Sequence, residues 1–382
     1  MVGGARLFLH RDNPFGARLQ IDTQITIKKI TMVLSMKIKQ LVSVLGMGIA
    51  ALVSFSTATA AEPEVTLKLH HMLPMSSTAH RRFLVPWADK VMAESNGRIQ
   101  IDIYPSMQLG GKPASLYDQA RKGVADIIWT VGGYTPGRFP KAGVFELPFM
   151  PASAKITSMA LQEYAEQEMQ DSFADVQLLA LHTHAPGSIH SRTTPVSRLE
   201  DLAGLKIRAS NKQMADALTL AGASPLFMPV PSVPSAFSKG VLDAALLPYE
   251  VVAPLKIHQM VDYHTEIHGD RGLYTQFFIF AMNKDAYAKL PADLQKVIDN
   301  NSGISTAGWI GAAWDESEQA GRKAAVEEGN QILVLSDSET ARWKTTMQPV
   351  TDGWTKEMDA AGNDGQRLYQ KAVDLINKYE QD

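Results

Sequence analysis

The sequence predicts an α/β protein with two domains and a cleft between them. Short β-prone runs alternate with helical patterns in two separate blocks, residues 65–131 and 176–247. A third, Ala-rich pattern from Pro291 to about Gly329 predicts one long and nearly uninterrupted helix. Two α/β units joined by extended crossings leave a cleft between them, and such clefts are where small ligands usually bind.

The first block has the order strand, helix, strand, helix, strand. Asn96-Gly97 and Gly123 are the turn and stop signals that end its two helices. This order is typical of a mostly parallel sheet. The expected strands are 65–69, 99–104 and 125–131, and the expected helices are 81–95 and 114–123.

The second block repeats this order. Gly222 and Pro225 follow its main helical pattern and are the expected C-terminal signals of that helix. Such a repeat predicts a second α/β unit, and the hinge between the two units would close around a ligand. The expected strands are 176–182, 205–209, 224–228 and 244–247, and the expected helices are 211–221 and 234–240.

Composition limits the classes of function. The chain has 382 residues, of which 45% are hydrophobic and 20% are charged, as in ordinary globular proteins. A formal net charge of -3 leaves no basic excess for a nucleic-acid partner. The chain has no cysteine, which excludes disulfides, thiol nucleophiles and cysteine-bound metals.

The N-terminal region carries a targeting signal. Residues 36–61 have two lysines, an apolar stretch from Leu41 to Phe55 and then Ala58-Thr59-Ala60, which is the layout of a secretory signal peptide. We expect cleavage after Ala60 or Ala61, with a retained membrane anchor as the alternative. Residues 1–35 are interpreted as a mis-annotated extension, and export of a cysteine-free chain indicates a periplasmic location.

No enzyme motif stands out. Histidines cluster in the sequence, but HExxH and comparable zinc spacings are absent. The GxSxG elbow of a serine hydrolase and the phosphate-binding GxxxxGK[ST] loop are also absent. We therefore predict a protein that is not an enzyme, with a periplasmic hydrolase as the weaker alternative. The clustered histidines are His182, His184, His258, His264 and His268.

Residues 197–248 carry a motif with a specific resemblance. They contain DLAGLKIR at 201–208, AGASP at 221–225 and GVLD at 240–243. This order resembles the solute receptors of TRAP transporters, the DctP-type family. Upstream, YPSMQLGG, DQARKGVADI and GRFPKAGVFELPF look like further landmarks of that family, and downstream AMNKDAYAKLPADLQKVI looks like its entry into a domain-spanning helix.

The resemblance implies a two-domain periplasmic binding protein with a central ligand cleft and a long helix that spans both domains. Domain I would comprise residues 62–185 and 276–315, and domain II residues 186–275 and 316–382. The implied partner is a TRAP membrane permease, to which the receptor delivers its ligand. A sensor protein that reports the ligand to a membrane kinase is the alternative, and a monomer is expected, with a dimer possible.

Arg208 is the first candidate for the ligand-binding site, because the resemblance aligns it with the arginine that holds the ligand carboxylate. A guanidinium offers paired donors that match a carboxylate and stays charged in a dry cleft. The alternative is that Arg208 pairs with a structural Asp or Glu. Asn211 could contact the ligand or simply cap the next helix. The other candidates are His71, Trp129, Tyr249, Gln276 and Phe277.

Departures from the family pattern point to an apolar ligand. Many relatives follow the "vDg" motif with Gln-Glu-Asn-Pro, whereas this chain continues with AALLP at 244–248. Together with Trp129, Tyr249 and Phe277, this predicts an aromatic or branched monocarboxylate or a 2-oxo acid. A second cationic contact could come from His184, His190 or Arg192. Neither a cofactor nor a metal is predicted, although Glu250 is the nearest candidate if a cation bridges the ligand.

Overall fold

The computed structural model describes residues 62–267 and 269–381. The interpreted extension at 1–35 and the predicted signal peptide at 36–61 therefore lie outside the described residues, as does His268. Among the helices of the described ranges, none combines the length and the apolar character that a membrane-spanning segment requires.

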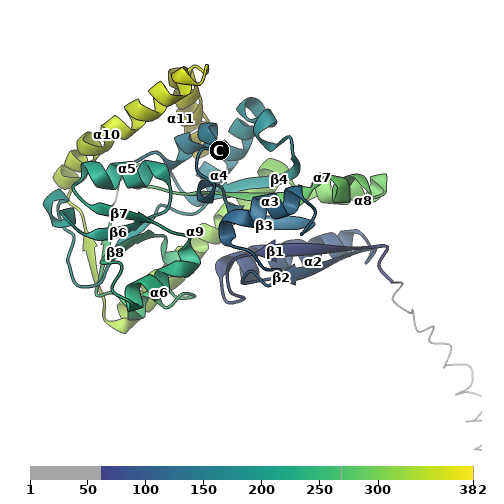
Figure 1. The fold of residues 1–382 in the computed structure, drawn as a ribbon, viewed down its shortest axis with the longest axis horizontal. Helices are drawn as coiled ribbons and strands as arrows, with labels where there is room; N and C mark the ends of the chain where they lie inside the picture. The colour runs from purple at the N-terminus through teal and green to yellow at the C-terminus, as the bar shows by residue number, and fades with distance from the viewer. Residues whose placement is uncertain (1–61, 268, 382) are drawn as a thin grey trace, which may run out of the picture. The chain divides into compact units, whose positions relative to one another are not determined.

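The first of two sheets has five strands in the order β2-β1-β3-β10-β4, of which β1 to β4 are labelled in Figure 1. Strand β1 pairs in parallel with β2 and β3, whereas β10 pairs antiparallel with β3 and β4. The strands are β1 (Val65–His71), β2 (Ile99–Tyr104), β3 (Ile127–Val131), β4 (Val176–Thr183) and β10 (Phe277–Asn283).

The helices associated with the first sheet come mostly from the first 170 residues. A π-helical turn, η1 (Ala79–Leu84), continues into α2, and the side chains of Phe83, Trp87 and Phe280 meet edge to face between helix and sheet. These aromatic contacts fix the helix on the sheet beyond their buried area. The helices are α2 (Val85–Glu94), α3 (Leu116–Arg121), α4 (Ala154–Glu168), α7 (Lys284–Ala288) and α8 (Ala292–Asn300).

The second sheet has six strands in the order β11-β9-β5-β8-β6-β7. Strand β6 is parallel to β7 and β8, and β5 is antiparallel to β8 and β9. Helices α5 (Lys212–Leu220) and α6 (Val233–Ser238) belong to this part of the chain (Figure 1). The strands are β5 (Ser188–Ser191), β6 (Lys206–Ala209), β7 (Ser224–Phe227), β8 (Ala244–Leu247), β9 (Tyr263–Glu266) and β11 (Gln331–Val334).

The expected helix from Pro291 to Gly329 is interrupted, and this prediction was wrong in that respect. Helix α8 ends at Asn300, and α9 (Gly303–Glu328) begins three residues later. The carbonyl of Asn301 accepts a hydrogen bond of 2.8 Å from Trp87 Nε1, and Gly303 has a φ of +75°. A carbonyl at the break between the two helices thus accepts the indole N–H of α2.

Helix α9 contacts elements of both sheets. Near its start it packs closely on α4, since a side chain at Gly311 would lie 2.5 Å from the Ala154 carbonyl oxygen. Asp315 then accepts hydrogen bonds from the backbone N–H groups of Ala154 and Lys155 at the start of α4. Further along, α9 packs on η8 (Tyr249–Val251), which follows β8 of the second sheet. The two sheets thus share this helix.

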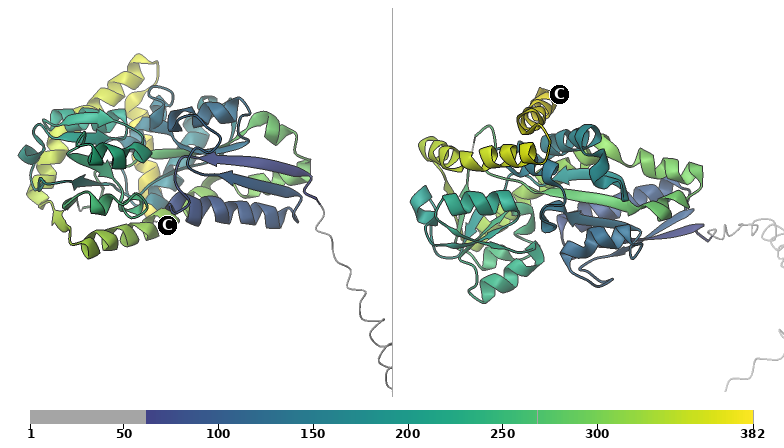
Figure 2. Two further views of the ribbon diagram at one scale, coloured as in Figure 1. Left: turned by 60° about the horizontal axis from the view of Figure 1, so that its bottom comes forward. Right: turned by 45° about the horizontal axis from the view of Figure 1, so that its top comes forward.

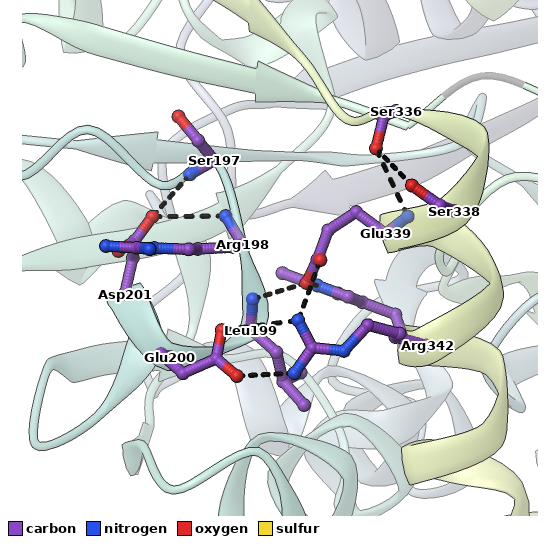
Figure 3. Close-up of polar contacts among 10 residues, drawn as sticks. Ser197, Arg198, Leu199, Glu200, Asp201, Ser336, Ser338, Glu339 and Arg342 are labelled. Atoms are coloured by element: carbon purple, nitrogen blue, oxygen red, sulfur yellow. Dashed lines mark hydrogen bonds and ion pairs between the residues drawn. The ribbon is translucent and has the colours of Figure 1, made fainter.

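The C-terminal helices make a second connection (Figure 2). Helix α10 (Asp337–Ala360) contacts α5 and the segment around Leu199–Leu202, and α11 (Gly365–Gln381) packs on α4. Figure 3 shows the start of α10, where Glu339 accepts a hydrogen bond of 2.6 Å from the Leu199 N–H. Arg342 bridges Glu339 and Glu200 beside this contact.

The predicted α/β class and its two units are confirmed, but the sheets are mixed rather than mostly parallel. Most expected strands lie within a few residues of those observed, and 244–247 coincides with β8. The antiparallel strand β10 was not predicted. Its sequence, FFIFAMN, is buried at every position and so lacks the alternation of polar and apolar residues that marks a half-buried strand.

Candidate ligand-binding site

A cavity of about 20 Å³ lies between the two sheets. Its walls come from the ends of β3 and β4, from β6 and β8, from η8 and from the start of β10. Strand ends that meet across two α/β units are the usual place for a ligand in this class of fold. Five of its side chains set its chemistry, namely Arg208, His184, Trp129, Phe278 and Glu250.

Arg208 on β6 reaches this cavity with only 1% of its surface exposed. Its Nη1 donates to the carbonyl of Leu246 at 2.8 Å and its Nε donates to the carbonyl of Met228 at 3.1 Å. Both partners are neutral backbone groups. The remaining nitrogen, Nη2, makes no hydrogen bond within the described residues.

The structural alternative for Arg208 would require an acidic partner, and none of the described residues provides one at salt-bridge distance. Elsewhere in the described chain a carboxylate such as Glu266 does have a cationic partner, Arg322, at 2.6 Å. A buried guanidinium whose neighbours are neutral dipoles, with no carboxylate beside it, is a costly arrangement unless an anion completes it. The geometry of Arg208 therefore suits the carboxylate of a ligand.

His184 stands beside Arg208 and is neutral. Burial, assisted by the positive charge of Arg208, lowers the pKa of His184 to about 3. Its Nδ1 lies 2.5 Å from the carbonyl of Ala185, which assigns the ring proton to Nδ1. The other nitrogen, Nε2, has no hydrogen-bond partner in the part of the chain that the structure describes.

An aromatic wall forms one side of the cavity. The rings of Trp129 and Phe278 stack with centroids 4.9 Å apart and planes 7° apart. Trp129 Nε1 donates to His182 Nε2 at 2.8 Å, so the indole has its polar atom satisfied and presents only its ring. Tyr134 and Val131 add to this surface, which suits the flat apolar body of a ligand.

Glu250 is the one acidic side chain among the described residues that line the cavity. Only 4% of its surface is exposed, and its Oε2 makes no hydrogen bond within the described residues. Burial, with a smaller effect of the nearby Glu318, raises the pKa of Glu250 to about 8. Thr78 and Trp314 lie close to this carboxyl group and partly counter the increase in its pKa.

Three of the seven candidate residues line the cavity, and these are Arg208, Trp129 and Gln276. Gln276 Nε2 donates to the carbonyl of Ser210 at 3.0 Å, which ties β10 to the end of β6. The other four candidates do not line it. Each of those four has a partner or a neighbour that accounts for its position.

Asn211 and Phe277 line a neighbouring pocket of about 60 Å³ beside Glu146. Asn211 caps α5, because its Oδ1 accepts from the Met214 N–H at 2.8 Å, and its Nδ2 donates to Thr275 O. The ring of Phe277 lies against Gly132, where any side chain would overlap it at 1.9 Å. Helix capping and core packing account for these two residues.

His71 and Tyr249 make their contacts outside the cavity. His71 Nε2 lies 3.0 Å from His80 Nδ1, and its Nδ1 accepts from the Leu73 N–H at 3.3 Å. Tyr249 donates its hydroxyl to Glu266 at 3.0 Å and stands edge to face with His190. His190 itself pairs with His264, so of the three proposed second cations only His184 lines the cavity.

Two residues that line the cavity were not predicted as site residues, although each is next in sequence to a residue that was. Phe278 lines the cavity where Phe277 was expected, and Glu250 lines it next to Tyr249. Phe277 and Phe278 are successive residues of β10 and so face opposite sides, whereas Tyr249 and Glu250 are neighbours on the 3-10 turn η8. Tyr134 and Val230 also line the cavity, and the hydrogen bond of 2.8 Å from the Val230 N–H to the Tyr134 hydroxyl joins two distant segments whose pairing the sequence did not indicate.

No group of three or more His, Asp or Glu side chains in the described ranges could hold a metal ion. The clustered histidines separate instead. His182 stacks on Phe278, and His258 lies near Val252 and Glu328.

Comparison with known proteins identifies the family of this chain. The family model described as "Bacterial extracellular solute-binding protein, family 7" (DctP) matches residues 69–357. A curated relative, the C4-dicarboxylate-binding periplasmic protein DctP of Rhodobacter capsulatus, is 23% identical over 80% of this chain and 91% of its own length.

Two solved structures are more similar. A TRAP solute binding protein from a marine metagenome, described as specific for aromatic acid ligands and in complex with 3-hydroxybenzoate, is 46% identical with a TM-score of 0.82, covering 83% of this chain and 99% of that one. A TRAP solute binding protein from Rhodoferax ferrireducens T118, with copurified benzoate, is 44% identical with a TM-score of 0.82, covering 83% and 98%. The chain belongs to the DctP family and is a periplasmic TRAP solute-binding protein, not an enzyme.

Proposed function

We propose that this protein binds an aromatic monocarboxylate in the cavity between its sheets and delivers it to a TRAP membrane permease. The observation that carries the proposal is the buried Arg208, whose Nη2 has no hydrogen-bond partner in the described part of the chain. A ligand carboxylate would accept from this nitrogen and balance the charge.

The body of the ligand follows from the walls of the cavity. Trp129 and Phe278 offer a stacked aromatic surface, and β8 adds Leu247 rather than the polar side chains that a sugar acid would need. The bound molecules of the two similar structures, 3-hydroxybenzoate and benzoate, are aromatic carboxylates of this kind. These relatives favour an aromatic acid over the branched and 2-oxo acids that the sequence left open.

The division into domains is part of the proposal. Strands at 65–183 and 277–283 build the first sheet and strands at 188–266 and 331–334 build the second, which supports domain I as 62–185 with 276–315 and domain II as 186–275 with 316–382. Helix α11 reaches back to α4 of domain I. Delivery to a permease would then follow closure of the two domains on the ligand.

A thermal-shift panel on the mature chain, beginning at Glu62, tests the function. We expect benzoate and mandelate to raise the melting temperature by several degrees at millimolar concentration, because a ligand that binds only the folded state stabilises it by mass action. Succinate and glucuronate should cause no shift, since neither fills an aromatic slot. Responses to those two acids alone, or to none of the four, would contradict the proposal.

A further inference from the structure

We infer that Glu250 forms a second polar subsite, which hydrogen-bonds a hydroxyl group on the aromatic ring of the ligand and so selects hydroxy-aromatic acids. This inference rests on the proposed function, because it assumes that the ligand carboxylate lies on Arg208. It adds a residue that distinguishes between acids which Arg208 alone would hold equally well.

The position of Glu250 supports this role. Glu250 and Arg208 line the same cavity, Arg208 from β6 and Glu250 from η8. The carboxyl group lies near Trp314, which is tilted against Trp129 and Phe278 with ring centroids about 6 Å away in each case. Glu250 thus lines the same cavity as Trp129 and Phe278, and its Oε2 is without a hydrogen bond in the described residues.

Helix α9 fixes the backbone around Glu250. Glu318 on α9 accepts hydrogen bonds from the Tyr249 N–H at 3.0 Å and from the Glu250 N–H at 2.9 Å. Gly321 allows α9 to approach so closely that any side chain there would lie 1.8 Å from the Tyr249 carbonyl oxygen. A subsite with its backbone fixed in this way loses little freedom when a ligand binds.

The protonation state of Glu250 also fits. Because burial and the neighbouring Glu318 raise its pKa to about 8, the group is mostly a neutral carboxylic acid at pH 7. A neutral acid does not repel the ligand carboxylate. It offers one O–H donor and one carbonyl acceptor, which together match a ligand hydroxyl, itself both donor and acceptor.

Because Glu250 Oε2 is buried and unpaired among the described residues, we expect the site to prefer ligands with a ring hydroxyl over ligands without one. A ligand without a hydroxyl leaves Oε2 unpaired in the closed cavity, and an unpaired buried polar group costs roughly 1–3 kcal/mol. A preference of about tenfold corresponds to about 1.4 kcal/mol. We therefore expect at least one ring-hydroxylated benzoate to bind about tenfold more tightly than benzoate.

Isothermal titration calorimetry of the mature chain at pH 7, in buffer with EDTA, provides the first test. The probes are benzoate, 3-hydroxybenzoate and 4-hydroxybenzoate, with 3-methylbenzoate and 4-methylbenzoate as controls of similar shape that cannot hydrogen-bond. The expected order places a hydroxybenzoate about tenfold ahead of benzoate and of its own methyl counterpart. A methyl acid that binds as tightly as its hydroxyl counterpart overturns the inference.

Variants then assign the preference to Glu250. Glu250→Leu and Glu250→Ala should reduce the ratio of the two dissociation constants to near one, whereas Glu250→Gln, which keeps a donor and an acceptor, should retain most of it. Using both apolar variants keeps the assignment independent of the folding of either. The matched control is Glu146→Leu, which removes another buried carboxyl with a pKa of about 8 from the neighbouring pocket. It should keep the wild-type ratio.

The outcomes separate the two claims. If the wild type binds no benzoate of any kind, the proposed function fails and not only this inference. If benzoates bind but Glu250→Leu or Glu250→Ala keeps the tenfold preference, the subsite is wrong and the receptor function stands. A preference that is seen only without EDTA would point to a bridging cation on Glu250 and would also overturn the hydrogen-bonding role.

Discussion

Arg208 places a full positive charge in an environment that offers it only dipoles. Two backbone carbonyls and no carboxylate of the described chain bind it, and Nη2 has no hydrogen-bond partner among the described residues. Lysine could not replace it, because one ammonium group cannot hold two carbonyls and a carboxylate in a fixed plane. At this scale, the shape of a single side chain determines the kind of ligand.

Other residues show where sequence interpretation ends. The sequence identified Arg208 through its motif and Trp129 through its place at a strand end, and both line the cavity. It could not choose between Tyr249 and Glu250, because η8 turns one neighbour toward Glu266 and the other toward the cavity. That choice depends on Glu318, which is 68 residues away from Glu250 in the chain.

Helix α9 contacts elements of both sheets. It packs closely on α4 at Gly311 and on η8 at Gly321, where a side chain would overlap the facing backbone. Its Ala-rich pattern was predictable, and so was its C-terminal stop at Gly329, which has a φ of +94°, but its start at Gly303 was not, because the expected helix began at Pro291. Its break at Asn301 and its contacts were not, because they depend on Trp87, Ala154 and Tyr249 from distant segments. Periodicity predicts a helix but not its neighbours.

Gly321→Ala should therefore destabilise the protein and weaken the binding of hydroxybenzoate. The added methyl group would meet the Tyr249 carbonyl oxygen at 1.8 Å, so η8 or α9 must shift, at a cost of about 1–3 kcal/mol. Chemical denaturation measures the change in the free energy of unfolding.

The matched control is Gly353→Ala in α10, where an added side chain would meet nothing within 4 Å. It should leave the stability unchanged or raise it by up to about 1 kcal/mol, because alanine favours a helix over glycine. Equal effects of the two substitutions would show that close packing of α9 on η8 is not important for stability.

At the scale of the whole molecule, buried histidines and glutamates act on stability in opposite directions. Burial lowers the pKa of His71, His182 and His184 to about 3. Their unfolded forms bind more protons between about pH 3 and 6.5, so they reduce stability as the pH falls through that range. The buried glutamates reduce stability at higher pH instead. Burial raises the pKa of Glu146 and Glu250 to about 8 and that of Glu318 to about 7.

Between about pH 4.5 and 8 the buried glutamates stay protonated in the folded protein but are ionised in the unfolded chain. They therefore reduce the stability of the folded protein as the pH rises through that range. We expect the melting temperature to be highest between about pH 4.5 and 6.5 and to fall on both sides. Scanning calorimetry from pH 4 to 8.5 measures this, and Glu146→Gln should flatten the alkaline decline. A melting temperature that rises steadily to pH 8.5 would refute the assignment.

The small cavity also has a consequence for the whole molecule. About 20 Å³ is enough for about one water molecule and not for an aromatic acid. If the ligand binds here as proposed, its entry requires the two sheets to move apart, and the chain passes between the sheets near Ala185, near Gln276 and along α9.

The most direct test of the central claim is the affinity of the mature protein for benzoate before and after Arg208→Met, measured by isothermal titration calorimetry. The substitution keeps much of the side-chain volume and removes the charge. We expect the affinity to fall at least about 100-fold, because a charge-assisted pair is lost from a buried site. Arg192→Met, at an arginine that does not line the cavity, should stay within about twofold of the wild type. Benzoate binding of wild-type strength in a folded Arg208→Met variant would contradict the account.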